Sequence, residues 1–326
     1  MTPSPETSKR KRFVASGVLV IDKPRGPTSH DVVARLRKAL GTREVGHAGT
    51  LDPMATGVLV VAIGEATKLV PYLTSAKKSY EATIALGVET DTLDAEGRES
   101  QRAPLSASLR TALAAFTNEQ GAAPEVVAAL EAERARTMQV PPQFSAIKQN
   151  GERAHAKARR GEAFELAARA VHVDDLRVLG TGDDECPWLA ISLSVSKGYY
   201  VRSLARDLAA SLGTVGHLTA LRRTRSGCFI IGEALALDTA ADELEARIVP
   251  LAHAATRALP RATLSETGLR DARHGRLVGR DQLDPSLHEP GAPHAWLSEG
   301  GTLVAIGEMR EDGGHVLRGF QEKASQ

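Results

Sequence analysis

The chain has 326 residues, of which 42% are hydrophobic and 25% are charged, as in an ordinary globular protein with a sizeable core. Its two cysteines, Cys186 and Cys228, are too few for a disulfide framework or a cysteine-rich zinc site. No apolar run reaches the length of a membrane span, and the formal net charge of +1 does not by itself indicate a nucleic-acid partner. A reducing cytoplasm is therefore the expected compartment.

The N-terminal part of the sequence predicts an arm, a strand, a helix and a loop, in that order. Residues 1–14 are rich in Pro, Ser, Thr and basic side chains, as in a disordered basic arm, and lack the apolar stretch of a secretory signal. Residues 17–21 form an apolar strand, after which Thr28 offers an N-cap for an amphipathic helix. The glycine-rich segment 44–57 predicts a loop that leads into the wholly apolar strand 58–63.

Farther along, helices and strands mix without a regular βαβ rhythm, which favours an α+β fold. Residues 65–70 predict a short helix that stops at Pro71, and the alternation of apolar and polar residues over 80–88 predicts a half-buried strand. Further helices are predicted at 105–116, 124–136 and 200–212, and a further strand at 188–195. After about residue 250, short strand-like pieces separated by Gly, Pro and Asp predict a small β-rich domain.

Basic residues gather at two places in the sequence. Between Ser145 and Arg160 they clearly outnumber the acidic ones, and a second cluster lies at residues 222–225. A solvated helix face and a phosphate-binding surface both fit a cluster of this kind.

The most informative segment is residues 46–57, which reads GHAGTLDPMATG. It places His47 and Asp52 in a loop that precedes a buried strand, and loops at strand edges are where functional groups concentrate. The residues of this loop leave two interpretations open. Asp52 is either a functional carboxylate or a turn residue whose side chain caps backbone N–H groups.

The segment resembles the catalytic motif of the TruB family of tRNA pseudouridine synthases. Four further blocks resemble the same family in the same order along the chain. They are GVLVIDKP (17–24) with GPTS (26–29); GEATK (64–68) with KSY (78–80) and TDTLD (90–94); QVPPQFSAIK (139–148); and SKGYYVR (196–202) with LRR (221–223). Five ordered blocks make the resemblance specific over residues 17 to about 230.

The resemblance implies a pseudouridine-synthase fold, in which a mixed, mainly antiparallel sheet is flanked by helices. That catalytic domain would span residues 15–250 and include a thumb-like RNA-binding insertion at 105–165. Because the stretch at about 119–138 is longer than usual for the family, we expect it to extend the thumb. Residues 251–322 resemble the family's PUA-like C-terminal domain.

The implied reaction isomerises uridine to pseudouridine in the T loop of tRNA, at position 55. Uracil leaves C1′ of its ribose through N1 and rejoins through C5, so that no metal or redox cofactor is expected. Asp52 would face the ribose as an ionised carboxylate, acting as nucleophile or as ribose base. Arg202 would keep Asp52 charged. Tyr80 would stack on the base and assist loss of the C5 proton.

The resemblance also assigns residues to substrate binding. Tyr200 and Leu221 would line the uracil pocket, His47 would fill the space left by the everted nucleotide, and Lys23 would support the pocket. Asp94 is interpreted as structural. The residues expected to meet RNA phosphates are Lys148, Arg153, Arg159, Arg160, Arg222 and Arg223. The sequence departs from the family pattern at Tyr199, Phe144 and His155, where Thr, Tyr and Tyr are usual.

The expected partner is the T arm of tRNA, bound by a monomer that needs no other protein. Two alternatives are a catalytic subunit that depends on a guide RNA and a tRNA-folding chaperone without catalysis. A hydrolytic glycosidase is disfavoured, because the matched blocks offer no obvious second carboxylate.

Overall fold

The computed structural model describes residues 15–117, 123–145, 147–149, 151–162, 164–183, 186–284 and 291–321. The disordered arm predicted at residues 1–14 lies outside these ranges. None of the described helices is long and apolar enough to cross a membrane.

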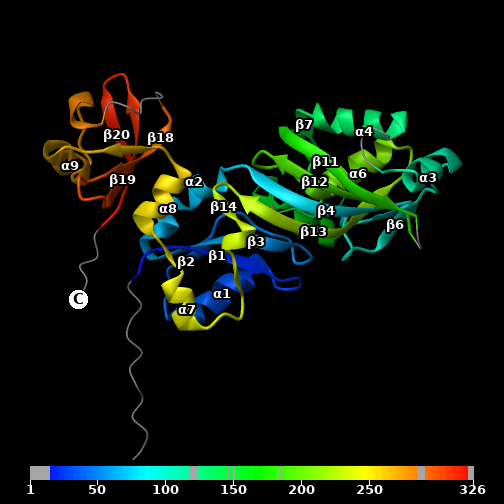
Figure 1. The fold of residues 1–326 in the computed structure, drawn as a ribbon, viewed down its shortest axis with the longest axis horizontal. Coiled ribbons are helices and arrows are strands. Elements are labelled where there is room, and N and C mark those ends of the chain that lie inside the picture. Colours follow the sequence, from blue (N-terminus) through cyan, green and yellow to red (C-terminus); the bar gives the residue numbers. More distant parts are fainter. Residues whose placement is uncertain are drawn as a thin grey trace, which may run out of the picture.

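A ten-stranded mixed sheet forms the centre of the described chain (Figure 1). Its main path runs β11 (Val173–Gly182), β12 (Trp188–Val195), β4 (Lys78–Leu86), β13 (Gly216–Ser226), β3 (Thr56–Ile63), β1 (Gly17–Lys23) and β15 (Leu235–Ala236). β2 (Val45–His47), β14 (Phe229–Ile230) and β16 (Val249–Pro250) pair with β3, β13 and β1. Neighbours are antiparallel except β13 with β3 and β1 with β15. This arrangement confirms the predicted α+β class with a mainly antiparallel sheet.

Helices cover the sheet and close one large apolar core. That core is shared by α1 (Ser29–Leu40), α3 (Ala107–Ala114), α4 (Pro124–Arg134) and α6 (Val201–Ser211). α1 begins at Thr28, whose side chain forms a capping box with Asp31, and ends at Gly41 in the left-handed conformation. The predicted first helix is therefore confirmed together with its N-cap. Figure 1 shows α4 and α6 over the half of the sheet that contains β11 and β12.

The insertion predicted at residues 105–165 is only partly separate from the catalytic domain. Leu109 and Leu113 of α3 and Val126 and Leu130 of α4 are buried in the main core. α4 lies within the stretch at about 119–138 that is expected to extend the thumb, and its buried side chains pack in the main core. The rest of the insertion contains β7 (Met138–Gln139), β8 (Lys148–Gln149), β9 (Glu152–Arg153) and α5 (Ala154–Arg159), and β7 pairs with β10 (Arg169–Ala170).

A second, four-stranded sheet lies near the C-terminus. It contains β17 (Arg261–Thr263), β18 (Pro293–Leu297), β19 (Leu303–Arg310) and β20 (Gly313–Gly319), with α9 (Glu266–Arg273) beside it. Trp296 is 1% exposed in its core, directly over Gly307, where an added Cβ would lie 2.3 Å from the indole ring. α8 (Leu251–Ala258) packs on β1 and on β18, so that it joins the two sheets (Figure 1).

Several short elements differ from their predictions. The predicted loop 44–57 contains β2, and the helix predicted at 65–70 is the 3-10 helix η1 (Gly64–Leu69). Pro71 does not end a helix but stands in the first turn of α2 (Val70–Thr74). A proline is tolerated there because the first turn has no intrahelical use for its missing N–H group.

Candidate active site

Asp52 and Arg202 form an ion pair between the loop that follows β2 and the first turn of α6. Nε of Arg202 lies 2.9 Å from Oδ2 of Asp52. The arginine side chain is 7% exposed and the aspartate side chain is 35% exposed. The guanidinium is therefore buried, whereas the carboxylate that it binds is partly open to solvent. Nη1 and Nη2 of Arg202 also donate to the carbonyls of Thr92 (3.0 Å) and Phe144 (2.9 Å). These bonds fix the guanidinium, and through it the orientation of Asp52.

Lys23 holds the far side of the same loop. Its side chain is fully buried at the end of β1, and Nζ donates to the carbonyls of Pro24 (2.9 Å), Pro27 (2.8 Å) and Pro53 (3.2 Å). Burial lowers the pKa of Lys23, while the charges of Glu96 and Asp52 oppose that shift. Because Pro53 directly follows Asp52, Lys23 is placed to support the loop.

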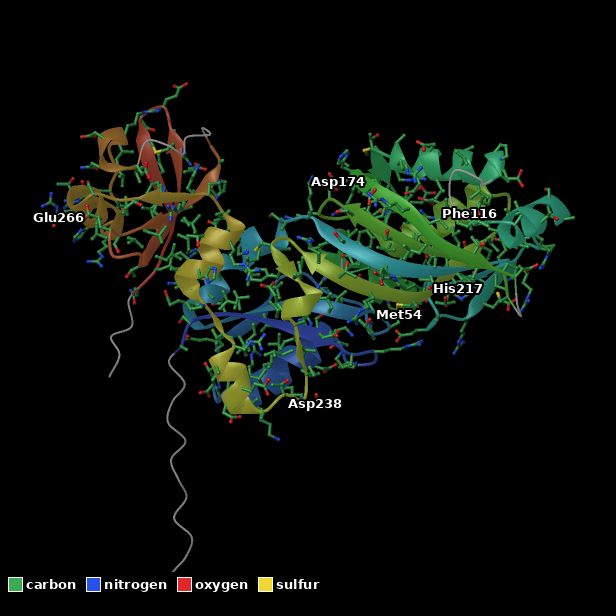
Figure 2. All side chains as sticks on the ribbon, viewed as in Figure 1. Met54, Phe116, Asp174, His217, Asp238 and Glu266 are labelled. Carbon is green, nitrogen blue, oxygen red and sulfur yellow. The ribbon has the colours of Figure 1, made fainter. Side chains whose placement is uncertain are left out.

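Tyr200 lies close enough to Asp52 and Arg202 to sense their charges, whereas Tyr80 and Leu221 belong to the neighbouring core. Tyr80 of β4 and Leu221 of β13 are buried in the core shared with α6. Tyr200 directly precedes α6, and both polar groups of its backbone are bound by the side-chain amide of Gln139 (2.8 and 3.1 Å). Burial raises the pKa of Tyr200, Asp52 raises it too, and the charges of Arg169 and Arg202 lower it. Figure 2 labels Met54, two residues after Asp52, which marks the loop below β13 in that view.

His47 ends β2, five residues before Asp52. Its ring meets that of His30 edge to face, with centroids 5.3 Å apart. Burial, and then the charges of His30 and Arg223, lower the pKa of His47. At neutral pH the ring is therefore an uncharged imidazole, which suits contact with an uncharged base.

The structure changes the interpretation of the arginine cluster on β13. Arg222 forms a bidentate ion pair with Asp22, Nη2 to Oδ2 at 2.8 Å and Nη1 to Oδ1 at 3.1 Å. Arg223 is 1% exposed and donates only inward, to backbone carbonyls. A guanidinium that does not reach the surface cannot meet a phosphate, so the prediction of an RNA contact at Arg223 is wrong.

The remaining predicted phosphate contacts lie on the insertion. Arg160 is exposed and pairs with Glu152 and Glu162. The side chains of Lys148, Arg153 and Arg159 lie outside the described part of the structure, and their RNA contacts stay predictions.

Asp94 contributes more to the site than its structural interpretation allowed. Its side chain is 6% exposed, and Oδ2 lies 3.7 Å from Nη1 of Arg202. The preceding Leu93 has a φ of 61°, a left-handed conformation that is uncommon for leucine. The TDTLD block marks this turn in the sequence, but it does not indicate which way the carboxylate points.

Together these groups define a class of site. A partly exposed carboxylate held by a buried guanidinium, with Tyr200 close by, suits attack on a sugar carbon or stabilisation of positive charge there. Among the described residues, no three His, Cys, Asp or Glu side chains gather as metal ligands would.

Comparison with known proteins gives the family. Residues 37–201 match the N-terminal domain of the TruB family of pseudouridylate synthases, and residues 202–259 match the C-terminal domain of tRNA pseudouridylate synthase B. The fold resembles that in the crystal structure of a Cbf5–Nop10–Gar1 complex, with a TM-score of 0.67 and 25% identity over 95% of this chain and 84% of that one. The chain belongs to the TruB family, which confirms the resemblance found in the sequence.

Two relatives show how far this similarity extends. The tRNA pseudouridine synthase B of Thermobifida fusca is 45% identical over 305 residues, which cover 91% of this chain and 96% of that protein. The protein of the same name from Mycobacterium sp. strain KMS is 46% identical over 310 residues, 94% of this chain and 97% of its own length. The similarity therefore includes most of the C-terminal sheet.

Proposed function

We propose that this chain isomerises uridine to pseudouridine at position 55 in the T loop of tRNA. Membership of the TruB family and relatives named tRNA pseudouridine synthase B support this activity. The observation that carries the assignment to particular residues is the 2.9 Å pair between Asp52 and Arg202, with Tyr200 beside it.

The reaction requires one bond to break and another to form at C1′. The N1–C1′ bond breaks and its electron pair leaves with uracil; the base turns, C5 bonds to C1′, C5 loses a proton and N1 gains one. Attack on C1′ and removal of a ribose proton both begin from an ionised Asp52. Tyr80 and Leu221 would hold the base, and His47 would fill the space that the everted nucleotide leaves.

The chain would act as a monomer in the cytoplasm, on the T arm of tRNA, with no obligate protein partner. Identities of 40–46% to proteins named for tRNA favour this stand-alone form over a guide-dependent subunit, since the Cbf5 chain is 25% identical. Lys148, Arg153, Arg159 and Arg160 are proposed to meet tRNA phosphates. The sheet within residues 251–322 is proposed to act as a PUA-like domain.

One experiment tests the activity, the residue and the two alternatives together. The purified chain and its Asp52→Asn variant are each incubated with an unmodified tRNA transcript, without any guide RNA, and pseudouridine is mapped. We expect modification of the T-loop uridine by the wild type and a loss of at least about 1,000-fold in the variant, with binding retained. Modification only after a guide RNA is added would identify the guide-dependent form. Binding without modification by the wild type would identify the chaperone.

A further inference from the structure

Arg223 is a buried arginine without an acidic partner among the described residues. Its side chain donates to backbone carbonyls in the described part of the chain: Nε to Val58 at 2.7 Å, Nη2 to Gly49 at 3.0 Å and Nη1 to Thr50 at 3.3 Å. Burial of a guanidinium costs desolvation free energy even when its donors are satisfied, and an apolar residue at this position would avoid that cost. Its presence therefore needs a reason beyond packing.

The three carbonyls belong to two different parts of the site. Val58 lies in β3, a central strand of the sheet, whereas Gly49 and Thr50 precede Asp52 in the loop. The planar guanidinium thus holds the loop against the sheet at two adjacent peptide groups. Gly49 has a φ of 96°, in the left-handed region that favours glycine, and an added Cβ there would be in van der Waals contact with Nη1 of Arg223, at 3.7 Å.

The same arginine stands next to Tyr80. In the register of β13 with β4, Arg223 is directly opposite Tyr80. Directly opposite residues on neighbouring strands have Cβ atoms about 5 Å apart. One side chain therefore connects the strand position of Tyr80 with the loop that carries Asp52.

We propose that Arg223 is a positioning residue, which fixes the Gly49–Thr50 backbone so that Asp52 faces the ribose while Tyr80 holds the base. This inference rests on the proposed function. It predicts that the planar, two-pronged shape of the guanidinium matters, and not only its positive charge. An ammonium group in its place could not bind β3 and both loop carbonyls with the same geometry.

The neighbouring arginine supplies a matched control. Arg222 differs from Arg223 by one position on β13, and its side chain pairs with Asp22 and is 39% exposed. Arg223→Lys and Arg222→Lys are the same chemical change on the same strand. They differ in whether the altered side chain reaches the Asp52 loop.

Each variant is assayed for the single-turnover rate on a tRNA transcript, for the Kd of that transcript and for its thermal midpoint. We expect Arg223→Lys to lower the rate constant between about 10- and 100-fold, the range that a displacement of about 1 Å produces, with Kd within about twofold of wild type. The predicted phosphate contact of Arg222 would change Kd, so the comparison uses the single-turnover rate constant at saturating transcript, which Arg222→Lys should keep close to that of the wild type.

A wild-type rate in Arg223→Lys would overturn the proposal. So would a loss that follows Kd, or a lysine variant that does not fold, since either result would assign Arg223 to tRNA binding or to the fold. The proposed function fails separately, because in that case the wild type itself makes no pseudouridine.

Discussion

Besides Arg202, three buried cations lie at the loop that carries Asp52, and each donates to backbone carbonyls. Lys23 binds Pro53, Arg223 binds Gly49 and Thr50, and Lys78 lies against Gly49 while it donates to Thr74 and Ala76. The hydrogen bonds of Lys23 and Arg223 fix the peptide groups on both sides of Asp52. The short loop is thus held mainly by residues from distant parts of the sequence.

Lys78 gives this arrangement a measurable pH dependence. It is 8% exposed, and burial, with the charge of Arg223 second, lowers its pKa to about 8 from 10.5. Below about pH 8 the amine is protonated in both the folded and the unfolded chain. Between about pH 8 and 10.5 the unfolded chain still holds the proton and the folded chain has released it, so stability rises with pH. A shift of this size corresponds to about 3 kcal/mol.

We predict that Lys78→Met removes this gain. The unfolding free energy of the wild type minus that of the variant should increase by up to about 3 kcal/mol between pH 7.5 and 10.5, measured by urea denaturation. Lys77→Met is the control, because Lys77 is 68% exposed and pairs with Asp174. Parallel pH curves for the wild type and Lys78→Met would contradict the prediction.

The start of α6, which presents Tyr200 and Arg202, is held by the segment that follows α4. Gln139 binds the backbone of Tyr200, and Ser203 donates to the carbonyl of Val140 at 2.9 Å. The hydroxyl of Tyr199 donates to Glu133 near the end of α4. Arg136 donates to the same carboxylate at 2.7 Å. α4 and the segment after it therefore help to hold the start of α6.

We predict that Tyr199→Phe lowers the free energy of unfolding by about 2 kcal/mol. Glu133 is 1% exposed, and loss of one donor leaves a buried carboxylate incompletely satisfied. Urea denaturation near pH 7 measures the change. Tyr72→Phe removes the same hydroxyl from a half-buried tyrosine whose hydroxyl has no hydrogen-bond partner among the described residues, and should change stability by less than about 0.5 kcal/mol. Equal losses in the two variants would show that the bond to Glu133 is unimportant.

Elements with a local signal in the sequence could be predicted, and elements defined by a partner could not. The capping pattern at Thr28 and the apolar run at 58–63 were sufficient for α1 and β3. β2 has only three residues and is defined by its pairing with β3. A strand this short shows no alternation of apolar and polar residues that could predict it. The site follows the same rule. The loop motif indicated Asp52, but only the register of β13 reveals that Arg223 points inward.

At the scale of the whole molecule, α8 makes the two sheets depend on each other. Ala254 and Ala255 are fully buried in a core that also contains Val60 of the large sheet and Leu297 and Ile306 of the small one. Small side chains let α8 approach both sheets closely. A domain boundary at residue 250/251 places α8 with the small sheet, although α8 packs on β1 and β16 of the large sheet as well as on β18 and β19 of the small one.

The shared core predicts that the described chain unfolds as one unit. In calorimetry the wild type should show a single transition, with a van't Hoff enthalpy close to the calorimetric one. Ala254→Leu should destabilise that transition by about 2 kcal/mol, because extra methyl groups in a filled core force both sheets apart. His253→Leu, at an exposed position of the same helix, should shift the transition far less. Two calorimetric transitions, with only one of them shifted by Ala254→Leu, would contradict the prediction. They would show that the C-terminal sheet unfolds independently and that α8 is part of only one of the two units.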